Sequence, residues 1–389
     1  MNYYKSALIL IFTRNIQNSS MAKGSGRLIS LDIFRGLTVA FMIIVNNPGS
    51  WEYVYPPLEH SKWNGCTPTD LVFPFFLFIV GMSTFFSLKK YGNEINGSSI
   101  LRILRRTITI FAVGLFLGIF PYFARDYSTV RIMGVLQRIA LAYGVGAILC
   151  LTIKREYLWI LIAVLLLAYW GLLAFFGGPG PYTLEGNIVL KTDIAILGKN
   201  HLYQGFGIPF EPEGLLSTIP SICTVLIGYF IGELVGKGSP DGKTAMKILL
   251  LGAASFGLGY LWNIIFAINK PLWTSSYVLY TAGLAMGVFS LIYLIADVLK
   301  FQAAGIFFTI FGTNALFSYF LAGILTRLLL LIHIHSGSEK LTLYSWFYEK
   351  VCVPVAGHLN GSLLFALIEM LVIWTFALFL YKKKIMIRL

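Results

Sequence analysis

The chain has 389 residues, of which 57% are hydrophobic and 12% are charged, and its formal net charge is +13. A soluble domain has about 25% charged residues, so this composition excludes an ordinary water-soluble globule. The hydrophobic residues come in blocks about 20 long, the length of a helix across a bilayer, and not in the alternating segments of about 10 that outer-membrane barrels show. We therefore predict an all-α, polytopic integral membrane protein.

Hydrophobic blocks predict ten transmembrane helices in chain order. They cover residues 33–47, 69–88, 103–121, 134–153, 157–176, 215–235, 247–268, 276–297, 304–333 and 362–381. The ninth block is long enough to tilt or to break near Gly312. We interpret residues 1–26 as a flexible leader, which is either disordered or upstream of the true start codon. Residues 27–389 then form a single transmembrane domain.

The basic residues predict how the helices are oriented. Ten spans put both termini on one side, and a cytoplasmic N-terminus places 20 of the 30 Lys and Arg residues inside. This distribution follows the positive-inside rule, so we predict that both termini are cytoplasmic. The positive charge is then a topology signal, and we predict no nucleic-acid partner. The loops predicted outside are rich in His, Pro, Trp and Asn, which indicates chemistry near the outer face.

Polar residues gather where the second span begins. His60 lies just outside this span, Asp70 lies in its first turn, and Asn46 ends the first span. Trp63 and Asn64 lie between them in the sequence. A histidine beside a carboxylate is a suitable general base, and an asparagine can donate a hydrogen bond to a developing oxyanion. Two alternatives stay open: an ordinary interfacial histidine, and an aspartate that only caps its helix.

Further polar side chains are candidates for contacting a substrate. Glu211 and Glu213 precede the sixth span, where they either cap the helix or hold an amine. Trp273 lies in the short turn 269–275, which is either an interfacial belt or part of the site. Asn314 lies in the ninth span and serves either helix–helix hydrogen bonding or a pocket wall.

Five residues are candidates for contacting an anionic co-substrate. Arg35 follows an aspartate by three residues and either pairs with it or meets a ligand from the cytosol. Gln137 and Arg138 lie one turn into the fourth span, where an arginine is costly unless it is paired, faces a cavity or extends to the interface. Arg105 and Arg106 belong to a basic cluster at the predicted inner face, which binds either phosphates or lipid headgroups.

The cysteine spacing and the absence of several known motifs exclude some classes of function. The four cysteines show no metal-ligand spacing, and we predict no metal site. Cys66 and Cys352 lie in predicted outer loops, where a disulfide between them is possible. The sequence has no Walker-type phosphate loop, no GxSxG and no HExxH motif, so it does not resemble an ATP-driven pump, a serine hydrolase or a zinc protease.

Several segments together resemble the heparan-α-glucosaminide N-acetyltransferase family. They are Leu31-Asp-Ile-Phe-Arg-Gly, Glu59-His-Ser-Lys-Trp-Asn-Gly-Cys-Thr-Pro-Thr-Asp-Leu-Val-Phe-Pro-Phe-Phe, Gly134-Val-Leu-Gln-Arg, Glu211-Pro-Glu-Gly and Asn269-Lys-Pro-Leu-Trp-Thr-Ser-Ser-Tyr-Val. The resemblance runs in the same order from about Arg27 to the C-terminus. It implies a bacterial member that lacks the lumenal N-terminal domain of the animal enzyme.

The resemblance also implies a reaction and its residues. The family moves an acetyl group from acetyl-CoA to the amine of a terminal glucosamine, across the membrane. His60 matches its essential histidine, Asn46 fits its active-site asparagine, and Asp70 fits its aspartate. His60 would either deprotonate the sugar amine or carry the acetyl group itself. The loop between Asn46 and His60 looks a few residues longer than in the animal enzymes, which leaves the acceptor open.

We therefore expect an acetyltransferase of the bacterial inner membrane, with acetyl-CoA as co-substrate. Its expected partners are the lipid bilayer and an amino-sugar or glycan substrate, and a homodimer is left open. The alternative is a permease for a sugar or cell-wall fragment that uses the same pocket. A scaffold without a ligand is a third hypothesis.

Overall fold

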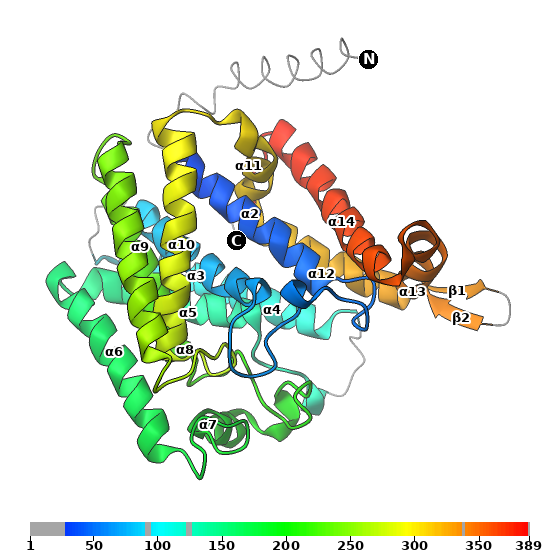
Figure 1. Cartoon of the computed structure of the whole chain (residues 1–389), viewed down its shortest axis with the longest axis horizontal. Coiled ribbons are helices and arrows are strands. Elements are labelled where there is room, and N and C mark those ends of the chain that lie inside the picture. Colours follow the sequence, from blue (N-terminus) through cyan, green and yellow to red (C-terminus); the bar gives the residue numbers. More distant parts are fainter. Residues whose placement is uncertain (1–27, 90–94, 122–126, 337–338, 388–389) are drawn as a thin grey trace.

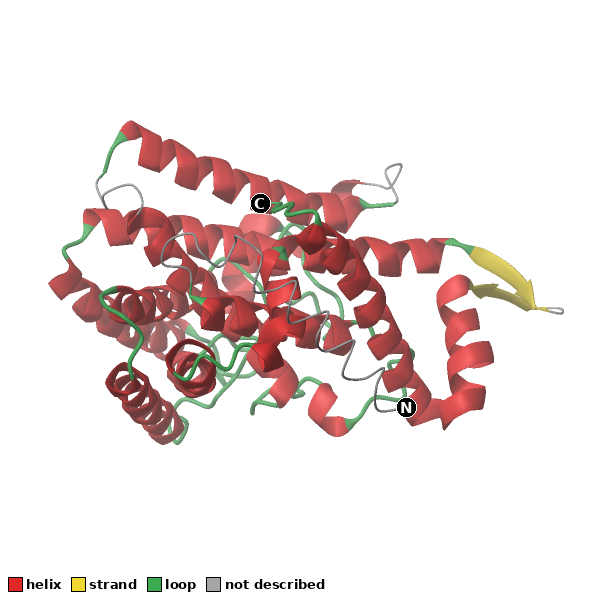
Figure 2. Cartoon of the chain, turned by 90° about the horizontal axis from the view of Figure 1, so that it is seen from above, coloured by secondary structure: helices red, strands yellow, loops and turns green. Residues whose placement is uncertain are grey.

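The computed structural model describes residues 28–89, 95–121, 127–336 and 339–387, so the predicted leader lies outside the described residues. Within these ranges the chain is mostly helical and has very little strand, which confirms the predicted all-α class (Figure 1). The exception there is one antiparallel hairpin of β1 (His333–Ser336) and β2 (Glu339–Thr342), which extends from the helices at one end of the molecule (Figure 2).

Long helices follow one another along the chain. They are α2 (Ile29–Asn46), α3 (Pro68–Lys89), α4 (Gly97–Ile119), α5 (Val135–Thr152), α6 (Arg155–Phe176), α8 (Thr218–Gly236), α9 (Gly242–Trp262), α10 (Ser275–Tyr293), α12 (Ala315–Leu331) and α14 (Val353–Lys382). Shorter helices are α7 (Ile188–Leu197), α11 (Ile306–Thr313) and α13 (Leu343–Phe347). Wider π-helical turns continue α10 over Leu294–Val298 and α13 over Tyr348–Cys352.

The structure supports most of the predicted spans. Eight of the described helices are long and apolar enough to cross a membrane, and a ninth candidate is the pair α11–α12, which is bent by 70°. Of the two alternatives for the ninth predicted span, a tilt or a break near Gly312, the structure shows the break, which falls at Asn314 between the two helices. The predicted count of ten is not reached by this criterion. At the position of the third predicted span, α4 carries three arginines in its first half.

Two predicted outer loops contain more structure than expected. The loop after α6 includes α7, and the loop after α12 includes most of the hairpin and α13. Val189 and Leu190 of α7 pack with Tyr169 and Leu173 of α6 in an apolar cluster separate from the main core. Helix formation here depends on that contact between segments, which local sequence patterns do not show.

Close helix crossings form the centre of the bundle. A Cβ atom on Gly81 of α3 would lie 1.9 Å from the carbonyl oxygen of Val225 on α8, and one on Gly228 would lie 2.0 Å from that of Phe78. Small residues allow backbones to approach in this way in membrane proteins. The crossing holds α3 against α8, so that their N-terminal ends lie at the same end of the bundle.

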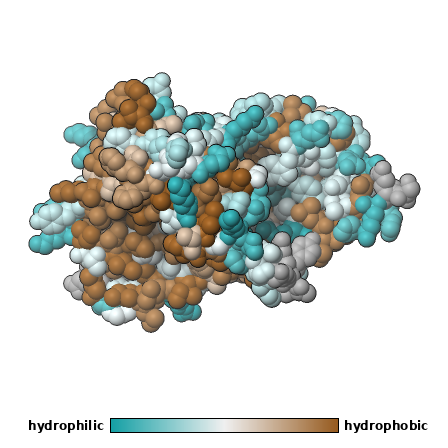
Figure 3. Space-filling model, turned by 90° about the horizontal axis from the view of Figure 1, so that it is seen from below, coloured by the Kyte–Doolittle hydropathy of each residue, from teal (hydrophilic) through white to brown (hydrophobic). Residues whose placement is uncertain are grey.

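Apolar side chains cover the outward sides of α6 and α9. Phe175 and Phe176 on α6 and Leu258 and Leu261 on α9 are exposed, and Figure 3 shows hydrophobic residues gathered over one large part of the surface. Figure 1 places both helices along one edge of the bundle. An extensive apolar surface on long helices is suited to contact with lipid. The chain is therefore a multi-pass membrane protein.

The structure decides whether the cysteines pair. All four are free thiols. Cys352 is buried in a cluster with Tyr348 and Phe365, whereas Cys66 packs beside Thr67 and Asp70. The disulfide between Cys66 and Cys352 that the sequence left possible is not formed, because the two thiols pack in different clusters.

Candidate active site

His60 and Asp70 form a hydrogen-bonded pair where α3 begins. The Nδ1 atom of His60 lies 2.6 Å from Oδ1 of Asp70. The carboxylate is fully buried, whereas 46% of the histidine side chain is exposed. An ionised carboxylate only accepts hydrogen bonds, so Nδ1 of His60 is the donor in this pair. The exposed part of the ring is accessible to a ligand, and Nε2 lies 3.5 Å from Nζ of Lys270.

Local backbone groups hold the carboxylate of Asp70 in place. The Oδ2 atom accepts hydrogen bonds from the backbone N–H groups of Ser61 and Thr67, each at 3.0 Å, and from the Thr67 hydroxyl at 3.1 Å. Tyr277 of α10 donates its hydroxyl to the backbone oxygen of Asp70 at 2.6 Å. Asp70 therefore both orders the loop before α3 and orients the ring of His60, and its part in a reaction stays a prediction.

Lys270, in the loop between α9 and α10, is the third charged residue of this cluster. Its Nζ atom lies 3.5 Å from Oδ1 of Asp70 and 3.1 Å from Nδ1 of His60. The lysine side chain is only 15% exposed. Burial lowers the pKa of Lys270, and Asp70 and Glu213 oppose this change. The same burial, with the nearby Asp70 charge, raises the pKa of the Cys66 thiol to about 12.

Trp63 and Asn64 join the His60 loop to two other loops. Asn269 donates from Nδ2 to Oδ1 of Asn64 at 3.1 Å, and the indole N–H of Trp63 donates to the backbone oxygen of Tyr182 at 2.9 Å. The Trp63 ring also packs edge-on against Phe210 at 5.4 Å between centroids. Both predicted substrate-binding residues therefore lie beside the His60 pair, and both also position its loop.

A second charged group lies directly before α8. Arg131 binds Glu211 through two hydrogen bonds of 2.8 and 2.6 Å and Glu213 through one of 2.7 Å. Burial raises the pKa of Glu211 to about 7 although Arg131 lowers it. Burial also opposes ionisation of Glu213, but Arg131, Arg138 and Lys270 hold its pKa below the usual range. Both predicted amine-binding carboxylates are therefore already paired with an arginine.

Arg138 and Trp273 connect the two charged groups. The guanidinium of Arg138 is fully buried and lies 5.0 Å from the centroid of the Trp273 ring. It donates to the backbone oxygen of Gly214 at 3.2 Å and to the Ser217 hydroxyl. Trp273 packs in turn against Phe73 of α3, at 5.1 Å between ring centroids. Arg138 thus faces the protein interior at the His60 end of the bundle and does not extend to the interface.

The structure at the end of α2 does not show directly the role predicted for Asn46. Asn46 is exposed at the last residue of the helix, whereas Asn47 is buried. The Asn47 amide donates to the backbone oxygen of Ile43 at 2.9 Å and accepts from Thr326 of α12 at 2.8 Å. Asn46 therefore has an amide that is open to solvent, and its assignment to the oxyanion remains a prediction.

Other predicted residues lie far from His60. Arg35 donates to Ser83 of α3 at 2.8 Å and to the backbone oxygen of Gly312 at 3.1 Å. Ser83 is 13 residues beyond Asp70 on the same helix, which corresponds to about 20 Å. Asn314, two residues after Gly312, bonds to the backbone of the segment after α14 through Ile385 and Ile387. The structure therefore places Arg35 and Asn314 near each other, at the opposite end of α3 from the His60 pair.

Three other candidates for contacting an anionic co-substrate, Gln137, Arg105 and Arg106, lie along the antiparallel pair of helices α4 and α5. Gln137 is buried against Gly114 of α4. Arg106 lies over the Tyr143 ring of α5, with its Cζ 4.6 Å from the ring centroid, and Arg105 is exposed. Eight residues of α4 separate Gly114 from Arg106, so the arginines lie about 12 Å along the helix from Gln137. These candidates do not form one compact group.

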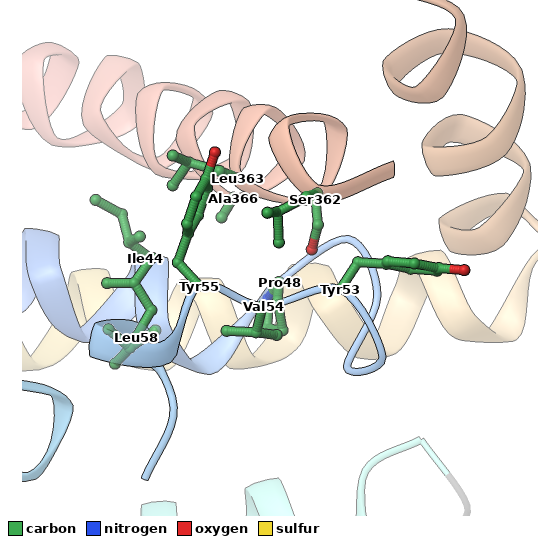
Figure 4. Close-up of a pocket in the computed structure, with 11 residues that line it drawn as sticks. Ile44, Pro48, Tyr53, Val54, Tyr55, Leu58, Ser362, Leu363 and Ala366 are labelled. Atoms are coloured by element: carbon green, nitrogen blue, oxygen red, sulfur yellow. The ribbon is translucent and has the colours of Figure 1, made fainter. Parts of the chain in front are cut away.

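A small pocket lies between α14 and the loop that follows α2 (Figure 4). Its lining includes Pro48, Tyr53, Tyr55 and Leu58 from the loop and Ser362 from α14. The loop is attached there by the Gly49 N–H, which donates to the Ser362 backbone oxygen at 3.1 Å. The cavity volume is about 10 Å³, room for roughly one water. This part of the longer loop is therefore closely packed on α14.

Sequence reasoning missed Lys270 and Arg131 as site residues. Lys270 lay inside a segment that was interpreted either as an interfacial belt or as part of the site, but only Trp273 was selected from it. Arg131 lay in a loop to which no role was given. One signal was available, because both are basic residues in loops predicted on the outer face, where the positive-inside rule disfavours them. Their partners could not be identified, because Lys270 meets a histidine 210 residues earlier.

The fold and the site together define a class of protein: a helical multi-pass membrane protein with a histidine–carboxylate pair at one end of its bundle. The sequence model of the family described as "Heparan-alpha-glucosaminide N-acetyltransferase, catalytic" matches residues 27–261. The chain belongs to this family, as the sequence resemblance indicated.

Two curated relatives carry the name heparan-alpha-glucosaminide N-acetyltransferase. The protein from Mus musculus is 29% identical over 349 residues, which cover 72% of this chain and 51% of the relative. The protein from Homo sapiens is 29% identical over 331 residues, which cover 70% of this chain and 49% of the relative. The chain therefore spans about half the length of the curated relatives it matches.

Proposed function

We propose that the protein transfers an acetyl group from acetyl-CoA to the amine of a glucosamine-like sugar, at the outer face of a bacterial inner membrane. The observation that carries this proposal is the His60–Asp70 pair, with a buried carboxylate on Nδ1 and an exposed ring edge. Membership of an N-acetyltransferase family supports the same reaction class. The amine as acceptor is inferred from the printed names of the relatives.

His60 can act by either of two routes. As a general base, Nε2 takes the proton of the sugar ammonium, and the free amine attacks the thioester carbonyl with CoA as the leaving thiolate. As a nucleophile, Nε2 attacks the thioester first, CoA leaves, and the acetyl-imidazole passes its acyl group to the amine. In both routes Asp70 fixes the tautomer of His60 and stabilises the imidazolium that forms. Asn46 is our proposed donor to the oxyanion.

The donor would reach this site from the cytoplasmic side. Arg35, Arg105 and Arg106 are our candidates for contacts with the phosphates of CoA, since guanidinium groups bind phosphate well. Arg138 lies at the His60 end of the bundle and Gln137 precedes it in α5, so we propose that these two residues line the last part of the path of the donor. Arg138 supports this assignment, because its Nε and Nη1 atoms are buried without a hydrogen-bond partner.

Acetyl transfer by the purified protein in detergent tests the proposal. With acetyl-CoA and glucosamine, the wild type is expected to form N-acetylglucosamine, and His60→Ala is expected to lose on the order of 10²- to 10⁴-fold in rate. His333→Ala is the matched control, because His333 is an exposed histidine on the hairpin. Full activity in His60→Ala would contradict the assigned role of this residue.

A permease remains the second candidate because of one observation. The bend of 70° between α11 and α12 breaks a span within the bundle, and broken helices line the binding sites of many transporters. Uptake of glucosamine by proteoliposomes without any acetylated product would favour this function over acetyl transfer.

A further inference from the structure

Lys270 stands out because it shares one carboxylate with His60. The Oδ1 atom of Asp70 lies 2.6 Å from the imidazole Nδ1 and 3.5 Å from the lysine Nζ. Nζ also lies 3.1 Å from Nδ1 and 3.5 Å from Nε2 of His60, so the lysine faces the ring from the side of both nitrogens. Two groups that can each carry a positive charge therefore meet a single carboxylate.

The loop that carries Lys270 is held tightly. The N–H of Trp273 donates to the backbone oxygen of Lys270 at 2.9 Å, and the Asn269 side chain accepts from the Leu272 N–H at 2.7 Å. Trp273 has a φ of 52°, a conformation that is uncommon for a bulky residue. Such conformations persist only where the surroundings fix them, and they gather at functional sites. These contacts fix the backbone at Lys270, and its side chain is only 15% exposed.

We propose that Lys270 is a positioning residue that keeps the imidazole of His60 uncharged, by sharing the carboxylate of Asp70 and placing its own ammonium group next to the ring. This inference rests on the proposed function, since a base or an acetyl carrier has to be neutral before it reacts. In water a lysine is about four pH units more basic than a histidine. Burial lowers the pKa of Lys270, but Asp70 and Glu213 oppose this change, so in our proposal the proton stays on Lys270 when only one of the two residues is charged. Two positive charges 3.1 Å apart repel each other, which disfavours a protonated His60.

The other groups around Lys270 fit this role. Glu213 approaches from the segment before α8, and Cys66 from the loop before α3. Tyr277 from α10 bonds to the backbone of Asp70. Asp70 and Glu213 stabilise the ammonium form of Lys270 against the cost of burial. The neighbouring elements therefore supply negative charge to the lysine, while the ring edge of His60 stays exposed.

The pH dependence of His60 modification tests the proposal without any substrate. Diethyl pyrocarbonate reacts with neutral imidazole, and the modified His60 peptide can be quantified by mass spectrometry over a range of pH. In Lys270→Met, the midpoint of this curve is expected to move to higher pH by about one unit, since a like charge beside the ring is lost. Lys270→Arg keeps the charge and is expected to stay near the wild-type midpoint.

The controls separate this inference from a structural role and from the proposed reaction. Lys62→Met removes an exposed lysine from the same loop as His60 and is expected to leave the midpoint unchanged. If Lys270→Met does not fold, Lys270→Gln serves as the neutral variant. A midpoint that is equal in the wild type and in the folded neutral variant overturns the proposal, as does an equal shift in Lys270→Arg. Because no acetyl transfer is measured, absence of the proposed activity would not mimic either result.

Discussion

Asp193 is a single buried carboxyl group that joins two segments at the end of the bundle that holds the site. This carboxyl group lies on α7, and its Oδ1 accepts a hydrogen bond from the Leu215 N–H at 2.9 Å, directly before α8. Its Oδ2 is buried without a hydrogen-bond partner. A Cβ atom on Gly214 would lie 1.7 Å from this oxygen, so only glycine fits there. Burial raises the pKa of Asp193 to about 6.

The raised pKa of Asp193 predicts a pH-dependent stability. The folded state binds the Asp193 proton more tightly than the unfolded state does. The contribution of this proton to the free energy of unfolding is therefore fully present below about pH 4 and is lost as the pH rises through 6. The loss is about 3 kcal/mol at most. The midpoint temperature of thermal unfolding in detergent is expected to fall less steeply between pH 4 and 6.5 in Asp193→Asn than in the wild type. Asp241→Asn, at an exposed helix cap, is the control, and parallel curves for all three proteins would refute the prediction.

Among the elements, the crossing of α3 and α8 matters most for the site. Asp70 begins one of these helices, and Ser217, which binds Arg138, directly precedes the other. Gly81 and Gly228 let the two backbones touch through the carbonyl groups of Val225 and Phe78. Even one added methyl group has no room at such a contact, and relief requires the helices to separate.

Gly81→Ala is therefore expected to destabilise the protein by about 1–3 kcal/mol or more, because overpacking forces the backbone to move. Its thermal unfolding in detergent should occur at a clearly lower temperature than in the wild type. Gly257→Ala is the matched control, since a Cβ atom on this residue of α9 meets nothing within 4 Å. Equal unfolding temperatures for the two variants would show that the crossing is not as tight as the structure indicates.

For the whole molecule, the distribution of charge remains the basis for the predicted orientation. The His60 cluster lies where α3, α8 and α10 begin, and the ion pairs of Glu233 with Arg155 and Lys237 lie where α8 ends. The two ends of the bundle thus differ in chemistry, which fits our proposal of an acyl donor on one side and an acceptor on the other. We propose that the His60 end faces outward.

Cysteine labelling of spheroplasts tests this orientation. In a background without the four native cysteines, Trp51→Cys is expected to react with a membrane-impermeant maleimide in intact spheroplasts, because Trp51 is exposed in the loop between α2 and α3. Gly238→Cys, in the exposed turn between α8 and α9, is expected to react only after lysis. The reverse pattern would place the His60 end in the cytoplasm.

The sequence by itself determined the class of protein, the approximate position of most helices and the His60–Asp70 pair. Blocks of apolar residues define spans because a helix in lipid satisfies its own backbone groups. His60 and Asp70 are ten residues apart on either side of a helix start, so local structure brings them together. The break near Gly312 was also predictable, because the apolar block there is longer than one span needs.

Only the tertiary structure decided which distant residues join that pair. Lys270 meets His60 across 210 residues, and Arg131 meets Glu211 across 80. It also placed Asn314, a predicted substrate contact, away from the His60 cluster and near Arg35, at the opposite end of α3. Such contacts depend on which helices pack together and at what height, and this is set by close crossings such as Gly81 against Val225. Local patterns of polarity do not encode these heights, so the composition of the site followed only from the packed bundle.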